Sequence, residues 1–425
     1  MQISSRNLRK RDRTGKPVPT LPHPALNPEA TATVISGAQP KLALTAAIAT
    51  VSIVGVGLSL SMALLSVRLA EAGYSARAIG LNPAAGGLAT LAIARFVPRL
   101  ARRLGVQTLL FIALLTAIAS LAAFAAHENY WSWLVIRGVF GAALTILFVL
   151  SEFWINSVAP PHRRGMILGL YTTSLAAGFA AGPTILTVTG TQGLMPFLAA
   201  IALFIVAAVP VAIVGGQAPE IEEQTKTSLR GFVAAAPVAT LAALFYGAIE
   251  TAAMGLLPVY ALHNGMAAET GALLVSLFAL GNVIFQIPVG LLSDRCNRRR
   301  LLLMIAAAGM LGALLLPLAL DTGFLLFAAL LVVWGGVVGS LYAVGLAHLG
   351  ARYKGAELAA ANATYIMLYS VGMLAGPPVL GVGLDLTPSG LFLAIALMLA
   401  SYLGITTWRV GTTVLDKADP RKQQF

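Results

Sequence analysis

The chain has a single cysteine, and charged side chains are scarce in it. Cys296 is the only cysteine among 425 residues, which excludes an internal disulfide and a cysteine-based metal cluster. Charged residues make up 10% of the sequence, against about a quarter in an average globular chain. The five histidines lack metal-ligand spacing, and no nucleotide-binding loop is present. We therefore expect no metal site, no cofactor, no ATP-driven pump and no enzymatic activity.

What the sequence does contain is apolar residues in long blocks. Hydrophobic residues make up 58% of the chain, and the mean hydropathy is +0.84. No charged residue occurs in 42–67 or in 301–320. A helix needs about 20 apolar residues to cross the hydrocarbon core of a bilayer. The blocks therefore predict an integral membrane protein, and their uniformity favours helices over the alternating strands of a barrel.

We expect an all-α membrane fold of twelve transmembrane helices in two six-helix halves. The predicted spans are residues 42–67, 77–97, 106–126, 130–155, 165–188, 194–215, 231–262, 267–292, 300–320, 322–347, 357–383 and 388–410. The expected domains are a disordered basic tail at 1–41, an N-terminal bundle at 42–215, a linker at 216–230, a C-terminal bundle at 231–410 and a tail at 411–425.

The distribution of Lys and Arg predicts the orientation in the membrane. Basic residues favour the cytoplasmic side of short loops. With both termini in the cytoplasm, 25 of the 28 Lys and Arg residues lie inside. The net charge of +12 is then a consequence of topology, and we expect no binding to nucleic acid.

The two halves contain similar sequence segments. The segment "GLYTTSLAAGFAAGP" parallels "ATYIMLYSVGMLAGP" at a spacing of 194 residues. Repeated six-helix halves are a recurring design of secondary transporters. Within these segments small residues are spaced for close helix contact, and prolines permit bending. The residues expected to serve packing and bending are Gly178, Gly182, Pro183, Gly372, Gly376 and Pro377.

A charged stretch between two apolar blocks carries a family resemblance. The sequence "GLLSDRCNRRR", starting at Gly290, resembles the signature loop of the major facilitator superfamily. This resemblance implies that Asp294 faces the positive N-terminal end of a helix in the other half and helps to latch the cytoplasmic side. The basic residues hold the loop inside; they include Arg295, Arg298 and Arg299. In the first half, the loop "ARFVPRLARRLG" has Pro98 where the acid belongs.

Further motifs fit the same family. "IRGVFGA" resembles its Arg-Gly motif and implies that Arg137 influences protonation, although bonding to backbone carbonyls is an equal alternative. "GLYTTSLAAGFAAGP" is similar to the antiporter motif of drug exporters, but the second half carries a similar copy, which also fits packing. "YGAIETAAMGLLPVYALHNG" with "QIPVGLLSDR" resembles a poorly characterised bacterial branch. We therefore expect a protein of the bacterial inner membrane.

Buried ionisable residues are the strongest candidates for function. Glu250 lies deep in the span at 231–262, where a charge costs at least about 2.5–3.5 kcal/mol. Tyr246 lies one turn earlier on the same face and is placed to bond the carboxyl. We expect Glu250 to handle protons or substrate, the alternative being a structural bond to a neighbouring helix. Glu152, near the cytoplasmic end of its span, is expected to form a gate or fold contact with Arg163 or Arg164.

Polar residues on other spans are expected to offer a polar and aromatic cavity wall. These candidates are Asn282, Gln286, Asn362, Tyr365 and Tyr369. Such residues also often join helices by hydrogen bonds, which is the alternative interpretation. Every third span is almost free of polar groups and is expected to face lipid as a support.

Together these features predict a monomeric secondary transporter that works by alternating access in the lipid bilayer. Proton coupling is the expected energy source, with export of a small amphipathic compound or metabolite. The alternatives are a proton-symport importer of a small nutrient and a membrane sensor or assembly partner with the same fold, because fold alone does not fix function.

Overall fold

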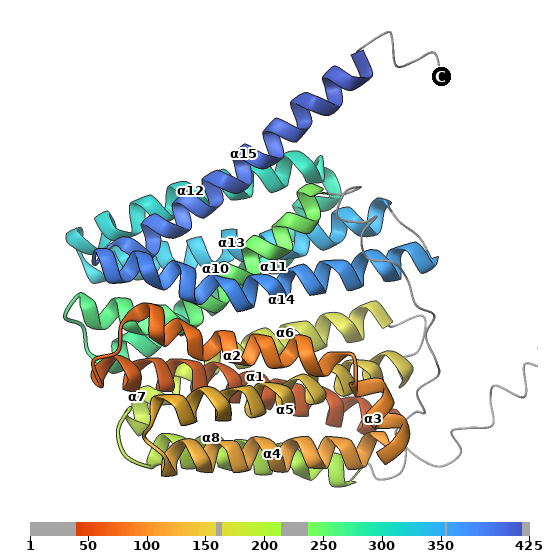
Figure 1. The fold of residues 1–425 in the computed structure, drawn as a ribbon. Coiled ribbons are helices and arrows are strands. Elements are labelled where there is room, and N and C mark those ends of the chain that lie inside the picture. The colour runs from red at the N-terminus through yellow and green to blue at the C-terminus, as the bar shows by residue number, and fades with distance from the viewer. Residues whose placement is uncertain (1–39, 159–163, 214–236, 353–354, 419–425) are drawn as a thin grey trace, which may run out of the picture. The chain divides into compact units, whose positions relative to one another are not determined.

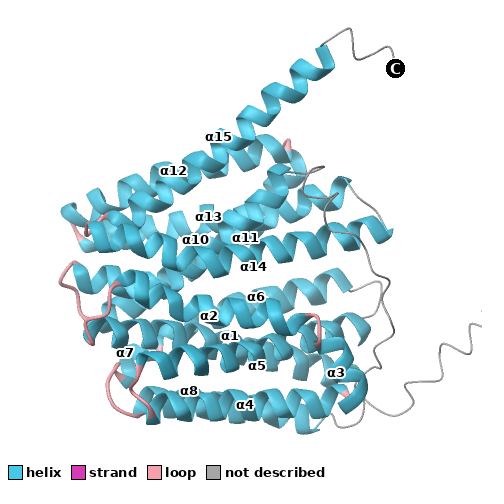
Figure 2. Ribbon diagram, in the orientation of Figure 1, coloured by secondary structure: helices cyan, strands magenta, loops and turns pink. Residues whose placement is uncertain are grey.

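The computed structural model describes residues 40–158, 164–213, 237–352 and 355–418. Within these ranges the chain is helical apart from short turns, and no strand is present (Figure 2). The predicted all-α fold is confirmed. Residues 1–39, the predicted linker at 216–230, Arg163 and residues 419–425 lie outside the described ranges.

The N-terminal helices cover the first half of the chain. They are α1 (Pro40–Glu71), α2 (Ala76–Ala94), α3 (Val97–Leu104), α4 (Val106–Ala126), α5 (Tyr130–Val158), α6 (Arg164–Thr184), α7 (Leu186–Thr189) and α8 (Met195–Ile213). The C-terminal helices follow. They are α10 (Pro237–His263), α11 (Ala268–Arg295), α12 (Arg298–Thr322), α13 (Phe324–Arg352), α14 (Gly355–Leu386) and α15 (Gly390–Ala418). The last helix continues past the predicted end of its span at residue 410.

Each of the twelve predicted spans corresponds to a helix. In the described part of the chain, ten helices are long and apolar enough to cross a membrane, and the bent pair α2–α3 makes an eleventh. The remaining predicted position is occupied by α6, whose 21 residues include many small and hydroxyl-bearing side chains. A helix that faces lipid needs a long apolar surface, whereas a helix that packs closely against others, such as α6, needs small residues.

The segment that corresponds to the signature loop in the first half is helical. It forms α3, which bends by 60° from α2. Pro98 lies in the first turn of α3, where its missing N–H removes no intrahelical bond. Arg102 and Arg103 lie in the last turn, where positive charge complements the helix dipole. The basic cluster thus stabilises a short helix.

The helices predicted as supports lie at the outside of the assembly. In Figure 1, α4 and α8 form the outer layer on one side, and α12 and α15 form it on the other. α4 packs against α5 and α8, while α12 packs against α13 and α15. The more polar helices, α10, α11 and α14 among them, lie between these layers (Figure 1). Glu250, the strongest candidate from the sequence, therefore lies on an interior helix.

Glycines mark the closest helix crossings within each half. A Cβ atom at Gly182 would collide with the carbonyl oxygen of Val56, so α6 lies directly on the backbone of α1. In the C-terminal helices, a Cβ atom at Gly372 would collide with the carbonyl oxygen of Leu244 on α10. The paired sequence segments therefore make the same type of contact in both halves. Gly178 and Gly376 lie at the same two crossings.

The N-terminal and C-terminal helices meet along a seam between α2 and α14. A Cβ atom at Gly80 would lie 2.5 Å from the backbone of Pro377, and one at Gly381 would lie 2.6 Å from the carbonyl oxygen of Ala76. α14 runs through Pro377 and Pro378 without a break. The two helices approach most closely where α2 begins and α14 ends. We call this end of the molecule, where α1 is joined to α2, the α1–α2 end.

Replacing Gly372 with valine tests this packing. The new side chain would enter the backbone of α10, so we expect the free energy of unfolding to fall by about 1–3 kcal/mol. The matched control is Gly404→Val, because a Cβ atom at Gly404 meets no atom within 4 Å. Thermal unfolding in detergent measures both variants. Equal melting temperatures would contradict the close crossing of α10 and α14.

Candidate functional site

Glu250 is the centre of a hydrogen-bonded cluster in the C-terminal helices. It lies midway along α10, and its side chain is partly buried. The hydroxyl of Tyr246, one turn earlier, donates to Oε1 at 2.6 Å. The hydroxyl of Tyr369 on α14 donates to Oε2 at 2.5 Å. The predicted contact with Tyr246 is present, and Tyr369 supplies a second donor from another helix.

This bonding pattern suits an ionised carboxylate. Both oxygens of Glu250 accept a hydrogen bond, and an ionised carboxylate is an acceptor only. A proton on either oxygen makes that oxygen a donor and weakens it as an acceptor, so the hydrogen bond from the tyrosine facing it becomes weaker. Protonation of Glu250 is thereby coupled to the arrangement of hydroxyl groups on α10 and α14. Within the described residues, the ion pair that the structure shows joins Arg68 to Glu128 and does not involve Glu250.

Asn282 on α11 brings a third helix into the cluster. Its side-chain amide donates to the hydroxyl of Tyr246 at 2.9 Å. A Cβ atom at Gly339 on α13 would lie 2.5 Å from Oδ1 of Asn282, so a glycine is required beside the amide. Asn282 orients Tyr246, which in turn faces Glu250.

Tyrosine rings surround the carboxyl on the α13 side. The ring centroid of Tyr342 lies 5.7 Å from that of Tyr246, 5.4 Å from that of Tyr369 and 5.1 Å from that of Tyr365. The hydroxyl of Tyr365 donates to the carbonyl oxygen of Tyr342 at 2.7 Å. Sequence analysis missed Tyr342, although a tyrosine in an otherwise apolar span was a detectable signal. We call Tyr246, Tyr342, Tyr365 and Tyr369 the tyrosine cluster.

Arg137 is buried among the N-terminal helices. Its Nη1 donates to Oγ of Ser61 on α1 at 3.0 Å, and its guanidinium lies 5.6 Å from the ring centroid of Phe140. Its Nε has no hydrogen-bond partner within the described residues. No contact joins Arg137 to Glu250 in that part of the chain. The two buried charges therefore belong to separate environments.

The carboxyl of Glu152 on α5 lies near tyrosines of two other helices. Its side chain is exposed, and its carboxyl interacts with the hydroxyls of Tyr171 on α6 and Tyr342 on α13. The interaction with Tyr342 crosses from one half to the other. The predicted partners Arg163 and Arg164 are not described at the side-chain level.

The remaining predicted residues lie at different places. Gln286 is exposed one turn after Asn282, and the side chains of Asn362 and Asp294 lie outside the described part. In the signature loop, Arg295 is exposed, Arg299 is partly buried, and Nη1 of Arg298 donates to the carbonyl oxygen of Ala347 at 3.2 Å. Asn297, which sequence analysis overlooked, caps α12 by accepting from two backbone N–H groups.

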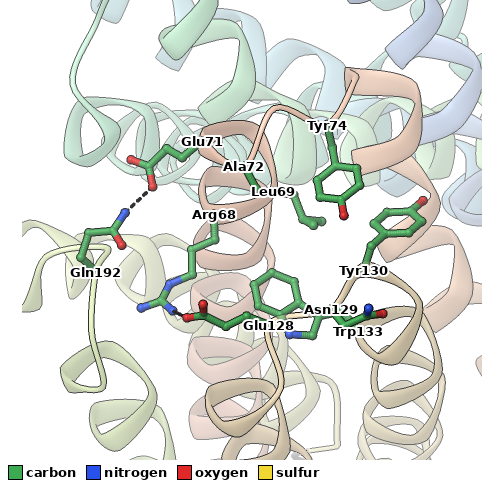
Figure 3. Close-up of a pocket in the computed structure, with 10 residues that line it drawn as sticks. All are labelled: Arg68, Leu69, Glu71, Ala72, Tyr74, Glu128, Asn129, Tyr130, Trp133 and Gln192. Carbon is green, nitrogen blue, oxygen red and sulfur yellow. Dashed lines mark hydrogen bonds and ion pairs between the residues drawn. The ribbon is translucent and has the colours of Figure 1, made fainter.

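A pocket of about 290 Å³ opens at the α1–α2 end (Figure 3). Nη1 of Arg68 lies 3.6 Å from Oε1 of Glu128, and Nε donates to the carbonyl oxygen of Thr191. Gln192 donates to the carboxylate of Glu71. Figure 3 shows these side chains turned toward one another. They tie the ends of α1 and α5 to the turn before α8, a framework that sequence analysis did not identify.

Comparison with known proteins gives a consistent picture. The family model described as Major Facilitator Superfamily matches residues 46–240 and again residues 239–424. The MFS-type transporter YfkF of Bacillus subtilis (strain 168), which is named as uncharacterized, is 30% identical over 336 residues, covering 77% of this chain and 85% of the relative. The uncharacterized MFS-type transporter YcaD of Salmonella arizonae is 23% identical and covers 82% of this chain and 91% of the relative.

Solved structures share the fold at low sequence identity. The nucleoside transporter NupG has a TM-score of 0.67 at 14% identity, covering 87% of this chain and 97% of that one. A bacterial homologue of the human lysosomal transporter Spinster has a TM-score of 0.65 at 13% identity, with coverages of 87% and 95%.

Removal of one tyrosine hydroxyl tests the cluster around Glu250. Tyr369→Phe leaves Oε2 without its donor, so we expect a loss of about 1–3 kcal/mol in the free energy of unfolding. Tyr342→Phe is the matched control, because its ring contacts are retained and its hydroxyl makes no hydrogen bond to Glu250. Denaturation of both variants at pH 7.5 gives the comparison. A loss of the same size in Tyr342→Phe would argue against the bond.

Proposed function

The chain belongs to the major facilitator superfamily, and from this premise we propose a proton-coupled secondary transporter that exports a small amphipathic compound or metabolite. The family consists of transporters, so a multi-pass membrane carrier is the starting point and an enzyme is not. The observation that carries the proton coupling is the Glu250 carboxyl, held by two tyrosine hydroxyls from α10 and α14. Export is supported by the resemblance of "GLYTTSLAAGFAAGP" to the motif of drug exporters.

The proposed cycle moves two six-helix halves, residues 42–215 and 231–410, about a site between them. The family match occurs twice, once on each half, which supports halves that move as units. The seam of α2 and α14 closes at the α1–α2 end in this structure. Opening that end while closing the other would expose the same site alternately to the two sides of the membrane.

Glu250 is the proposed proton carrier. Its two tyrosine donors and the amide of Asn282 stabilise the ionised form without a fixed positive charge, so a proton remains free to bind. When the proton binds, the hydrogen bond from one tyrosine hydroxyl weakens, and Tyr369 belongs to α14, which forms the seam. Proton loading thus acts on a helix that moves in the proposed cycle. The tyrosine cluster supplies an aromatic and polar wall for an amphipathic substrate.

The chain is proposed to act as a monomer in the inner membrane with both termini in the cytoplasm. Cys296 tests this orientation without any new label site, because it is exposed in the turn between α11 and α12. We expect a membrane-impermeant maleimide to modify Cys296 in inside-out vesicles and to leave it unmodified in intact cells. The control is Cys296→Ser with Asn264→Cys, in the exposed turn after α10, which should react in intact cells. The reverse pattern would overturn the orientation.

A thermal-stability screen tests proton coupling. Purified protein is heated with a library of metabolites and drugs at pH 5.5 and pH 7.5, beside Glu250→Gln. A ligand that binds the folded state adds about 2.7 kcal/mol at a hundredfold excess over its dissociation constant. In proton-for-substrate exchange the substrate binds best when Glu250 is ionised, so we expect larger stabilisation at pH 7.5, and no pH dependence in Glu250→Gln.

Glu269→Gln, at the start of α11, is the matched control and should keep the pH dependence of the unaltered protein. If ligand stabilisation depends on pH in the same way in the unaltered protein and in Glu250→Gln, Glu250 has a structural role and does not carry the proton. Larger stabilisation at pH 5.5 would favour the symport importer. For a hit, energised cells that lose preloaded compound support export, whereas accumulation contradicts it.

A further inference from the structure

Asp385 connects the two halves at the α1–α2 end. It lies in the last turn of α14, and its side chain is exposed. Oδ1 accepts a hydrogen bond from the backbone N–H of Ala76 at 2.5 Å, and Oδ2 accepts one from Arg77 at 2.9 Å. Both donors belong to the first turn of α2. A C-terminal helix therefore caps the start of an N-terminal helix with both oxygens of one carboxylate.

Helix electrostatics favour this contact over the separated state. The first N–H groups of a helix have no partner within it, and its N-terminus carries partial positive charge. Asp385 meets two of these groups on α2, while Ser75 accepts from a third at Ala78. At the end of its own helix the carboxylate faces partial negative charge, which is unfavourable. Separation of the halves therefore leaves Asp385 next to like charge and exposes donors on α2.

The start of α2 is held firmly from its own side. The hydroxyl of Tyr130 donates to the carbonyl oxygen of Ala78 at 2.8 Å, and its ring stacks on Tyr74 at 4.8 Å (Figure 3). The Arg68 framework fixes the neighbouring end of α1. Asp385 consequently binds a rigid target. These contacts anchor the start of α2 to its own half, so it would stay with that half if α14 moved away.

We propose that Asp385 is a latch that keeps the α1–α2 end closed, and that its two bonds to α2 break each time this end opens. The latch rests on the alternating access of the proposed function, but it requires neither proton coupling nor Glu250. Its exposure lets water replace the two bonds on opening, so the latch is reversible. In the proposed orientation it controls access from outside the cell.

A cysteine reporter at the seam measures the opening. Ser66 on α1 is buried, and its Oγ lies 3.8 Å from where a Cβ atom of Gly255 on α10 would be. Ser66→Cys in a Cys296→Ser background therefore places one thiol between the halves near the α1–α2 end. A membrane-impermeant maleimide added to intact cells reaches this thiol only when that end is open.

Asp385→Asn keeps an acceptor oxygen and removes the charge, so it weakens the latch without deleting the side chain. We expect labelling of the Ser66→Cys reporter to become about two- to fivefold faster, the size expected for losing an exposed carboxylate charge at a helix N-terminus. Asp385→Glu should restore part of the closure. Asp321→Asn is the matched control, because this aspartate lies in the last turn of α12 at the same end.

The salt dependence of labelling gives a second measurement, made with the reporter in the presence and absence of Asp385. An exposed carboxylate–dipole contact is screened by ions, so raising the salt should speed labelling with Asp385 present and leave Asp385→Asn unchanged. Gel filtration and melting curves verify that each variant is folded. Equal labelling of the reporter with and without Asp385→Asn, at both salt concentrations, overturns the latch. If Asp385→Asn speeds labelling but ligand stabilisation shows no dependence on pH that requires Glu250, proton coupling is refuted and the latch stands.

Discussion

In the described part of the chain, glycines lie at close crossings of long helices, and the membrane explains why. A bilayer gives helices no hydrophobic reason to associate, so close van der Waals contact and a few hydrogen bonds must hold them together. Gly182 on α6 and Gly372 on α14 let one backbone lie directly on another within each half. Gly80 and Gly381 do the same between the halves. The same kind of close contact therefore holds the helices within each half and joins the two halves.

The close crossing of α10 and α14 also brings hydrogen-bond donors to the buried carboxyl of Glu250. Tyr369 reaches Glu250 because α14 lies on α10, with Gly247 admitting the backbone at Tyr369. A carboxylate in a membrane requires hydrogen-bond donors, and tyrosine hydroxyls provide them while the rings remain compatible with the apolar surroundings. A lysine or arginine in their place would fix the carboxylate in its charged form. Neutral donors leave the charge of Glu250 able to change, which is the requirement for proton handling.

Sequence reasoning succeeded where one helix supplies both partners and stopped where several helices meet. The contact of Tyr246 with Glu250 follows from four-residue spacing, and the twelve spans follow from apolar length. Asn282 was recognised as polar, but its bond to Tyr246 depends on the approach of α11, which spacing on one helix cannot reveal. Tyr342 was detectable as a tyrosine in an apolar span, but its ring contacts with Tyr246 and Tyr369 depend on the approach of α13 to α10 and α14. Asp385 was missed because a single acid near a span end resembles any solvated residue until α2 is placed beside it.

Asp385 also bears on the signature loop at the opposite end of the fold. The resemblance implies that Asp294, near the end of α11, faces a helix N-terminus of the other half, and Asp385 makes that kind of contact from the end of α14. Both carboxylates end helices of the C-terminal half, where each is unfavourable to its own helix dipole. In this structure Asp385 has such a contact, and the proposed latch would hold only while its end of the molecule is closed. If Asp294 makes the contact that the resemblance implies, the two latches would compete through the motion of the halves, and a change in the charge of either would shift the balance between the two proposed access states.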